Sequence, residues 1–150
     1  MKKFGWVLLL SLPLAALAQK VNVDKKTNMV TVDKVYSFKI DRFDCGIGAT
    51  NCHFDVSDTS GTKVLRINFR EFKSFAERNA SNPEGRIVYY EFVFLTSKTK
   101  AEINFVGGKE EKVAKAIVKN NLFLNGKLNE KAVEEFVLVN GTPFSVRARQ

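Results

Sequence analysis

One set of polar side chains could act together, because its members recur at every second position along four stretches that are otherwise apolar. Strand side chains alternate between two faces, so these positions would share one side of an antiparallel sheet. The set consists of His53, Asp55, Arg66, Asn68, Arg70, Tyr89, Glu91, Glu102 and Asn104. No other part of the sequence predicts a comparable convergence of ionisable groups.

A binding face is one hypothesis for this set. The guanidinium groups of Arg66 and Arg70 would hold an anionic group, and the Tyr89 ring would offer a stacking surface. The simplest alternative is a solvated sheet face, on which Glu91 and Glu102 form ion pairs with Arg66 or Arg70. Both hypotheses place the same side chains on the same face of the sheet.

Catalysis is the competing class of function. His53 is the only histidine, and Gly-x-Ser-x-Gly and phosphate-binding glycine motifs are absent. A small hydrolase would use Glu91 with His53, or Glu91 paired with Glu102 or Asp55 as in sugar hydrolases. We predict a binding protein without a catalytic residue, and keep the hydrolase as the alternative. The ligand-binding residues would be His53, Arg66, Asn68, Arg70, Tyr89 and Glu91.

A third hypothesis is an inhibitor of an extracellular enzyme. Such a protein needs a protruding loop, and 79–85 or 45–52 could supply one. The second loop contains both cysteines, Cys45 and Cys52, which we predict to form a disulfide. Their spacing is not Cys-x-x-Cys, and Cys52 with the adjacent His53 lacks further metal ligands. We therefore predict no metal and no cofactor.

The element that would position the set is the run from Ile87 to Thr96, the longest series of β-branched and aromatic residues after residue 18. It predicts a central strand, because both of its faces are apolar. Turns at 97–98 and 58–61 predict two hairpins. In these, Phe94 would lie opposite Ala101, and Phe54 opposite Leu65.

The remaining elements flank this sheet. Short strands are expected at 21–23, 29–32 and 35–40, although the partner of 35–40 is not evident. Helical periodicity predicts helices at 109–121 and 130–139, the second capped by Asn129. The turn between them would bury Leu122 and Leu124, and the tail 144–150 would form an edge strand or stay loose. The fold class is α+β: an antiparallel sheet of about six strands with two C-terminal helices packed on one face.

The first residues have the order of a cleavable export signal: two lysines, an apolar run and small residues before Gln19. We predict cleavage between Ala18 and Gln19, a single domain over residues 19–150, and a periplasmic or secreted location. The remaining 22 basic and 16 acidic residues give a net charge of +6. The lysines are scattered among acids, which favours an unknown protein or anionic ligand as partner over nucleic acid. No transmembrane segment is expected after cleavage.

The C-terminal pattern KEEKVAKAIVKNNLFLNGKLNEKAVEEFVLVNG resembles the C-terminal part of small exported bacterial proteins that have no assigned activity. The resemblance covers about the last third of the chain. It implies a periplasmic or secreted location and assigns no role to any residue.

Overall fold

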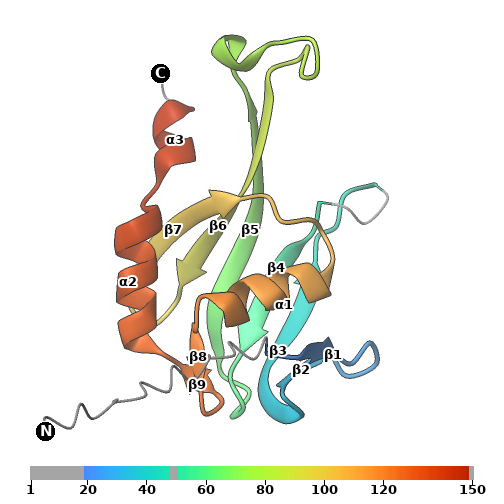
Figure 1. Cartoon of the computed structure of the whole chain (residues 1–150), viewed down its shortest axis with the longest axis vertical. Coiled ribbons are helices and arrows are strands. Elements are labelled where there is room, and N and C mark those ends of the chain that lie inside the picture. The colour runs from blue at the N-terminus through green and yellow to red at the C-terminus, as the bar shows by residue number, and fades with distance from the viewer. Residues whose placement is uncertain (1–18, 48–50, 149–150) are drawn as a thin grey trace, which may run out of the picture.

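The chain folds around an antiparallel sheet of seven strands, whose order in space repeats their order in the sequence (Figure 1). The computed structural model describes residues 19–47 and 51–148. The export signal predicted at 1–18 lies outside the described residues. The strands of the sheet are β1 (Val21–Val23), β2 (Met29–Val32), β3 (Val35–Phe43), β4 (His53–Ser57), β5 (Lys63–Lys73), β6 (Arg86–Phe94) and β7 (Thr99–Asn104).

Two helices cover one face of this sheet, which confirms the predicted α+β class. The helix α1 (Glu110–Lys119) packs over β1 and β3, and α2 (Glu130–Asn140) lies along β7. Asn129 caps α2 by accepting a hydrogen bond from Ala132 N. A small hairpin of β8 (Phe123–Leu124) and β9 (Lys127–Leu128) joins the two helices.

The hydrophobic core fills the space between the helices and the inner face of the sheet. From the helices it receives Val113 and Ile117 of α1 and Phe136 of α2, all buried. The Phe136 ring packs against Phe92 and Phe94, with centroids 5.3 and 6.0 Å apart. The side chains at alternate positions therefore project from the opposite, outer face of the sheet.

The two predicted hairpins exist, but both predicted registers are wrong by two residues. Phe94 lies opposite Thr99 instead of Ala101, and Phe54 lies opposite Ile67 instead of Leu65. The loops span residues 95–98 and 58–62, where turns at 97–98 and 58–61 were predicted. A shift of two residues keeps every side chain on its predicted face, because the period of a strand is two.

The C-terminal segment differs from its prediction. Instead of an edge strand or a loose tail, it forms the short helix α3 (Pro143–Arg147), with Pro143 in its first turn. Leu122 is fully buried as predicted, whereas Leu124 is 61% exposed. The strand predicted at 35–40 extends to Phe43 and pairs with β2 and β4.

The far ends of β5 and β6 project beyond the rest of the sheet as a two-stranded arm, residues 71–88 (Figure 1). These strands pair with each other as far as Lys73 and Arg86. Strand β4 follows β5 only to Ile67, and β7 follows β6 only to Tyr89. The end of the arm, residues 74–85, contains the 3-10 helix η2 (Phe75–Glu77) and is called the tip below.

Cys45 and Cys52 form the predicted disulfide, which closes the loop directly before β4. Among the described residues, no helix has both the length and the apolar character needed to span a membrane.

Candidate functional site

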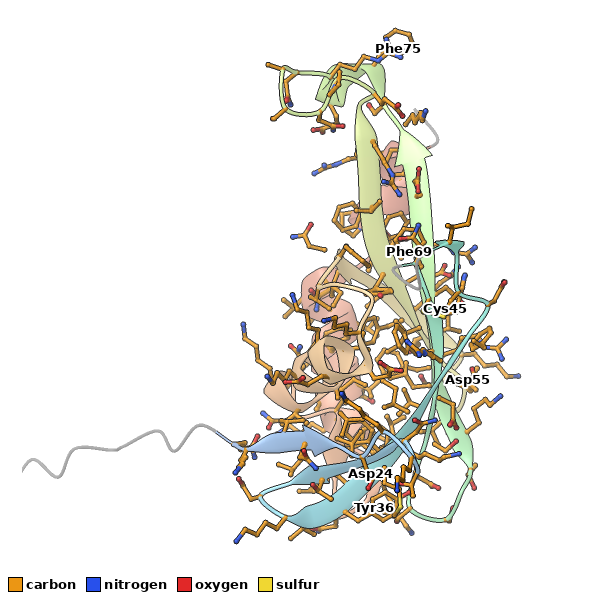
Figure 2. The ribbon with its side chains drawn as sticks, turned by 90° about the vertical axis from the view of Figure 1, so that its right-hand side faces the viewer. Asp24, Tyr36, Cys45, Asp55, Phe69 and Phe75 are labelled. Carbon is orange, nitrogen blue, oxygen red and sulfur yellow. A yellow bond between two sulfur atoms is a disulfide. The ribbon has the colours of Figure 1, made fainter. Side chains whose placement is uncertain are left out.

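The predicted polar set lies on the outer face of the sheet, opposite the helices. Asp55 of β4 pairs with Arg66 of β5, and Asn68 of β5 pairs with Glu91 of β6. Figure 2 shows Asp55 on the side of the sheet that faces away from the helices. The alternation of side chains along the strands, together with the covered inner face, accounts for this placement.

Glu91 is the centre of one polar network on this face. Its Oε2 accepts hydrogen bonds from Nε and Nη2 of Arg70, at 3.2 and 2.9 Å, and from Nδ2 of Asn68 at 3.1 Å. Nζ of Lys100 lies 3.4 Å from Oε1. Burial raises the pKa of Glu91, but the hydrogen bonds from Arg70 and Asn68 and the charges of Arg70 and Lys100 bring the pKa below its usual value. Glu91 is therefore held as a carboxylate.

His53 joins this network through Asn68 and not through an acid. Nδ1 of His53 lies 3.3 Å from Oδ1 of Asn68. Because Nδ2 of Asn68 faces Glu91, Oδ1 must act as the acceptor toward His53, and Nδ1 of His53 donates. The structure thus places His53 and Glu91 on one face, separated by the Asn68 amide.

Asp55 is the centre of a second network. Arg66 donates from Nε at 2.8 Å to Oδ1 and from Nη2 at 3.1 Å to Oδ2, and Lys63 contacts Oδ2 as well. Burial raises the pKa of Asp55, but the hydrogen bonds and charges of Arg66 and Lys63 lower it overall. The Arg66 guanidinium also lies over the Phe43 ring, 5.1 Å from its centroid.

Glu91 and Glu102 lie directly opposite each other on β6 and β7, and both are buried. The Glu102 N–H donates to the Gly141 carbonyl and not to β6, so the two acids form the closer type of cross-strand pair. The two carboxylates have different hydrogen-bond partners. Oε2 of Glu102 accepts the N–H groups of Phe144 and Ser145, at 2.8 and 3.0 Å, in the first turn of α3. Glu102 therefore holds α3 against this edge of the sheet and does not pair with an arginine as predicted.

Tyr89 does not offer the stacking surface that we predicted. Tyr89 as a whole is only 7% exposed. Its ring stacks on the ring of Phe144 in α3, with centroids 4.9 Å apart and planes 15° from parallel. Phe144, which supplies this cover, lies in the tail that we predicted to be an edge strand or loose. The aromatic ring beside an outer-face cation is that of Phe43 instead.

Two lysines of this face were missed by the sequence analysis. Lys100 lies at an outer position of β7, opposite Val93 of β6. Continuing the alternation backward from Glu102 would have found it. Lys63 reaches the face because the pairing of β4 and β5 shifts between Val56 and Ser57. We refer to Lys63, Arg66, Arg70 and Lys100 as the cation cluster.

The exposure of the charged groups is unequal. The carboxylate side chains of Asp55 and Glu91 are 13% and 11% exposed, whereas those of the cation cluster are 42–59% exposed. The acids thus lie beneath the cations. Within the described residues, no group of three or more His, Cys, Asp or Glu side chains could hold a metal ion.

Comparisons with known proteins give no further information about this site. Comparison with protein-family models found no match, and comparison with curated proteins and with solved structures found none with significant similarity. A function must therefore be inferred from the charges and contacts described above.

Proposed function

We propose that the chain is an exported, non-enzymatic binding protein whose outer sheet face binds an extended anionic ligand. The observation that carries this proposal is the arrangement of charge: two carboxylate side chains that are 11–13% exposed lie under four cationic side chains that are 42–59% exposed. The carboxylates hold the side chains of the cation cluster in place, while the outer N–H groups of the cluster face solvent. A ligand with negative groups would meet a preorganised positive surface.

The spacing of the cluster favours a ligand with several negative groups. Lys63, Arg66 and Arg70 follow one another along β5, three and four residues apart. At about 3.3 Å per residue, these intervals correspond to roughly 10 and 13 Å. One small anion could contact only a part of this row, whereas an acidic polymer could follow it. The net positive charge of the chain would add attraction over longer distances.

The disulfide supports the exported location, because disulfides persist mainly in oxidising compartments. The hydrolase alternative receives less support. A general acid must be protonated at its working pH, and the surroundings of Glu91 lower its pKa. His53 contacts Asn68 and could not take a proton from Glu91 directly.

Retention on immobilised heparin, a sulfated polymer, tests the proposal. The double variant Lys63→Gln/Lys100→Gln removes two exposed cations but leaves both arginine–carboxylate pairs intact. It should elute at clearly lower salt than the unchanged protein, because fewer counterions are exchanged on binding. The matched control, Lys115→Gln/Lys119→Gln on α1, removes the same charge from the helix-covered side. Equal shifts for both variants would mean that net charge alone causes retention, and would refute an outer-face site.

A further inference from the structure

The tip of the arm presents a large aromatic side chain to solvent. Phe75, the first residue of η2, is 82% exposed, and Figure 2 shows it at the extreme end of the molecule. The Arg78 guanidinium lies over the ring, 3.8 Å from its centroid. Aromatic and arginine side chains are enriched among the residues that dominate binding at interfaces. We call Phe75 and Arg78 the knob.

The backbone beneath the knob is held by hydrogen bonds. Oδ1 of Asn79 accepts the N–H of Asn82 at 2.9 Å, and Oδ1 of Asn82 accepts the N–H of Arg86 at 2.9 Å. Ser74 N donates to the Gly85 carbonyl, and a Cβ at Gly85 would lie only 2.0 Å from Ser74 O. The tip is therefore preorganised, and binding through it costs little ordering entropy.

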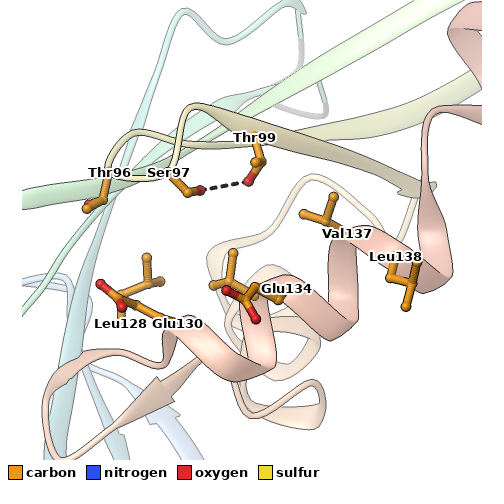
Figure 3. A pocket seen from close by; sticks show the side chains of 9 residues that line it. Thr96, Ser97, Thr99, Leu128, Glu130, Glu134, Val137 and Leu138 are labelled. Atoms are coloured by element: carbon orange, nitrogen blue, oxygen red, sulfur yellow. Dashed lines mark hydrogen bonds between the residues drawn. The ribbon is translucent and has the colours of Figure 1, made fainter.

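A groove with the complementary chemistry lies on the same chain, between the β6–β7 turn and α2 (Figure 3). Its volume is about 570 Å³. Two glutamates, Glu130 and Glu134, lie one helical turn apart on its α2 side and are exposed. Leu138, 85% exposed, lies at its end. Its apolar lining is formed by Leu128, Val133, Val137 and Leu138.

We propose that the knob of one copy inserts into this groove of a second copy. The Phe75 ring would cover the apolar lining, and Arg78 would lie beside Glu134 and Glu130, which have the opposite charge. The volume of the groove falls in the range of clefts that bind small molecules, so the groove is large enough for one aromatic side chain. Two of the large exposed apolar side chains of the chain, Phe75 and Leu138, would be buried in one contact.

The positions of the knob and the groove favour a reciprocal pair. The tip lies at one end of the molecule, and the groove lies beside α2, well away from the tip (Figure 1). Two copies in antiparallel orientation can each place a knob in the groove of the other. Such an exchange has two-fold symmetry, so the contact between knob and groove occurs twice in the pair. The tip also carries Glu77 and Glu84, which oppose binding to an anionic lipid surface.

Sedimentation velocity over a concentration series, from low micromolar to millimolar protein, tests this proposal. The unchanged protein should associate with increasing concentration. Phe75→Ala should weaken association by at least about 100-fold, because it removes the aromatic anchor of both contacts. Leu124→Ala is the matched control, since Leu124 is also exposed but lies outside the groove. A protein that stays monomeric throughout, or association that Phe75→Ala leaves unchanged, would overturn the proposal.

An exchange of charges tests the orientation of the contact. Arg78→Glu and Glu134→Arg should each weaken association by about tenfold, because each places like charges together in both contacts. An equimolar mixture of the two variants should form a mixed pair that regains most of the loss, since both of its contacts again join opposite charges. Glu135→Arg, next to Glu134 but outside the groove lining, should have little effect. No recovery in the mixture, or Phe75-dependent binding to phosphatidylglycerol vesicles without self-association, would overturn the proposal.

Discussion

Replacing Arg70 by methionine should destabilise the protein at neutral pH and much less in acid. The folded state lowers the pKa of Glu91 below its usual 4.5, despite the opposing effect of burial. A lowered pKa means that Glu91 contributes stability above its unfolded pKa, and that this contribution is lost as the pH falls through the lower folded pKa. Without Arg70, less of the effect of burial on the pKa of Glu91 is offset, so the folded-state pKa rises.

The magnitude follows from the exposure of the pair. Removing one partner of a buried ion pair costs about 3 to 5 kcal/mol. The Arg70 side chain is 49% exposed, and Glu91 retains Asn68 and Lys100, so we expect about half of that cost, roughly 2 kcal/mol at pH 7. Once the pH lies below the lowered folded pKa of Glu91, this group is protonated in both proteins, and the difference should fall under about 1 kcal/mol.

Urea denaturation followed by circular dichroism, at neutral and acid pH, measures this difference. At pH 7 the melting temperature should also fall by about 6 to 10 °C. Arg70→Met/Glu91→Gln should recover most of the loss, because it removes the stranded charge as well. Arg86→Met, which breaks the more exposed pair with Glu71, should destabilise the protein much less than Arg70→Met at pH 7. An equal loss at both pH values would refute the reasoning and point to the lost packing of the Arg70 stem.

Three other changes test the structure around the site. Replacing both Cys45 and Cys52 by alanine should lower the free energy of unfolding by about 2 to 3 kcal/mol in urea titrations, and should remove the effect of reductant on stability. Glu102→Ala should speed deuterium exchange at the Phe144 and Ser145 amides, because it removes their acceptor. Glu102→Gln keeps an acceptor oxygen and should speed this exchange less. Unchanged exchange in both variants would refute the role of Glu102 in holding α3. Phe136→Ala should cost about 3 to 5 kcal/mol in the same urea titrations, because it leaves a cavity beneath α2; a loss below about 1 kcal/mol would mean that the core refills.

Much of the fold was predictable because alternation and helical period depend on local patterns. The face assigned to His53, Arg66 and Glu91 is confirmed, although both hairpin registers were wrong. Loop geometry caused these errors. Asp58 Oδ1 accepts the N–H groups of Ser60 and Thr62, which closes a five-residue loop that an Asx-turn signal could have indicated.

Two errors at the candidate site, the pairing of Glu102 and the exposure of Tyr89, arise from distant contacts. Glu102 binds the N–H groups of Phe144 and Ser145, more than 40 residues further along the chain. The local sequence around Tyr89 does not indicate that Phe144 covers its ring. Pro143 does indicate a helix start, because proline is common in the first turn of a helix, but it does not indicate where that helix packs. Burial by a remote segment is set by tertiary packing, so periodicity alone could not decide which outer-face groups are accessible.

The sequential order of the seven strands has a consequence for the kinetics of folding. Each strand pairs with the strand that follows it in the sequence, and a single loop joins the two. Closing each hairpin therefore requires little loss of chain entropy. Low contact order of this kind favours rapid folding, and the sheet can grow in the direction in which the chain emerges from a ribosome. The helices, which come last in the sequence, would then seal a sheet that has already formed.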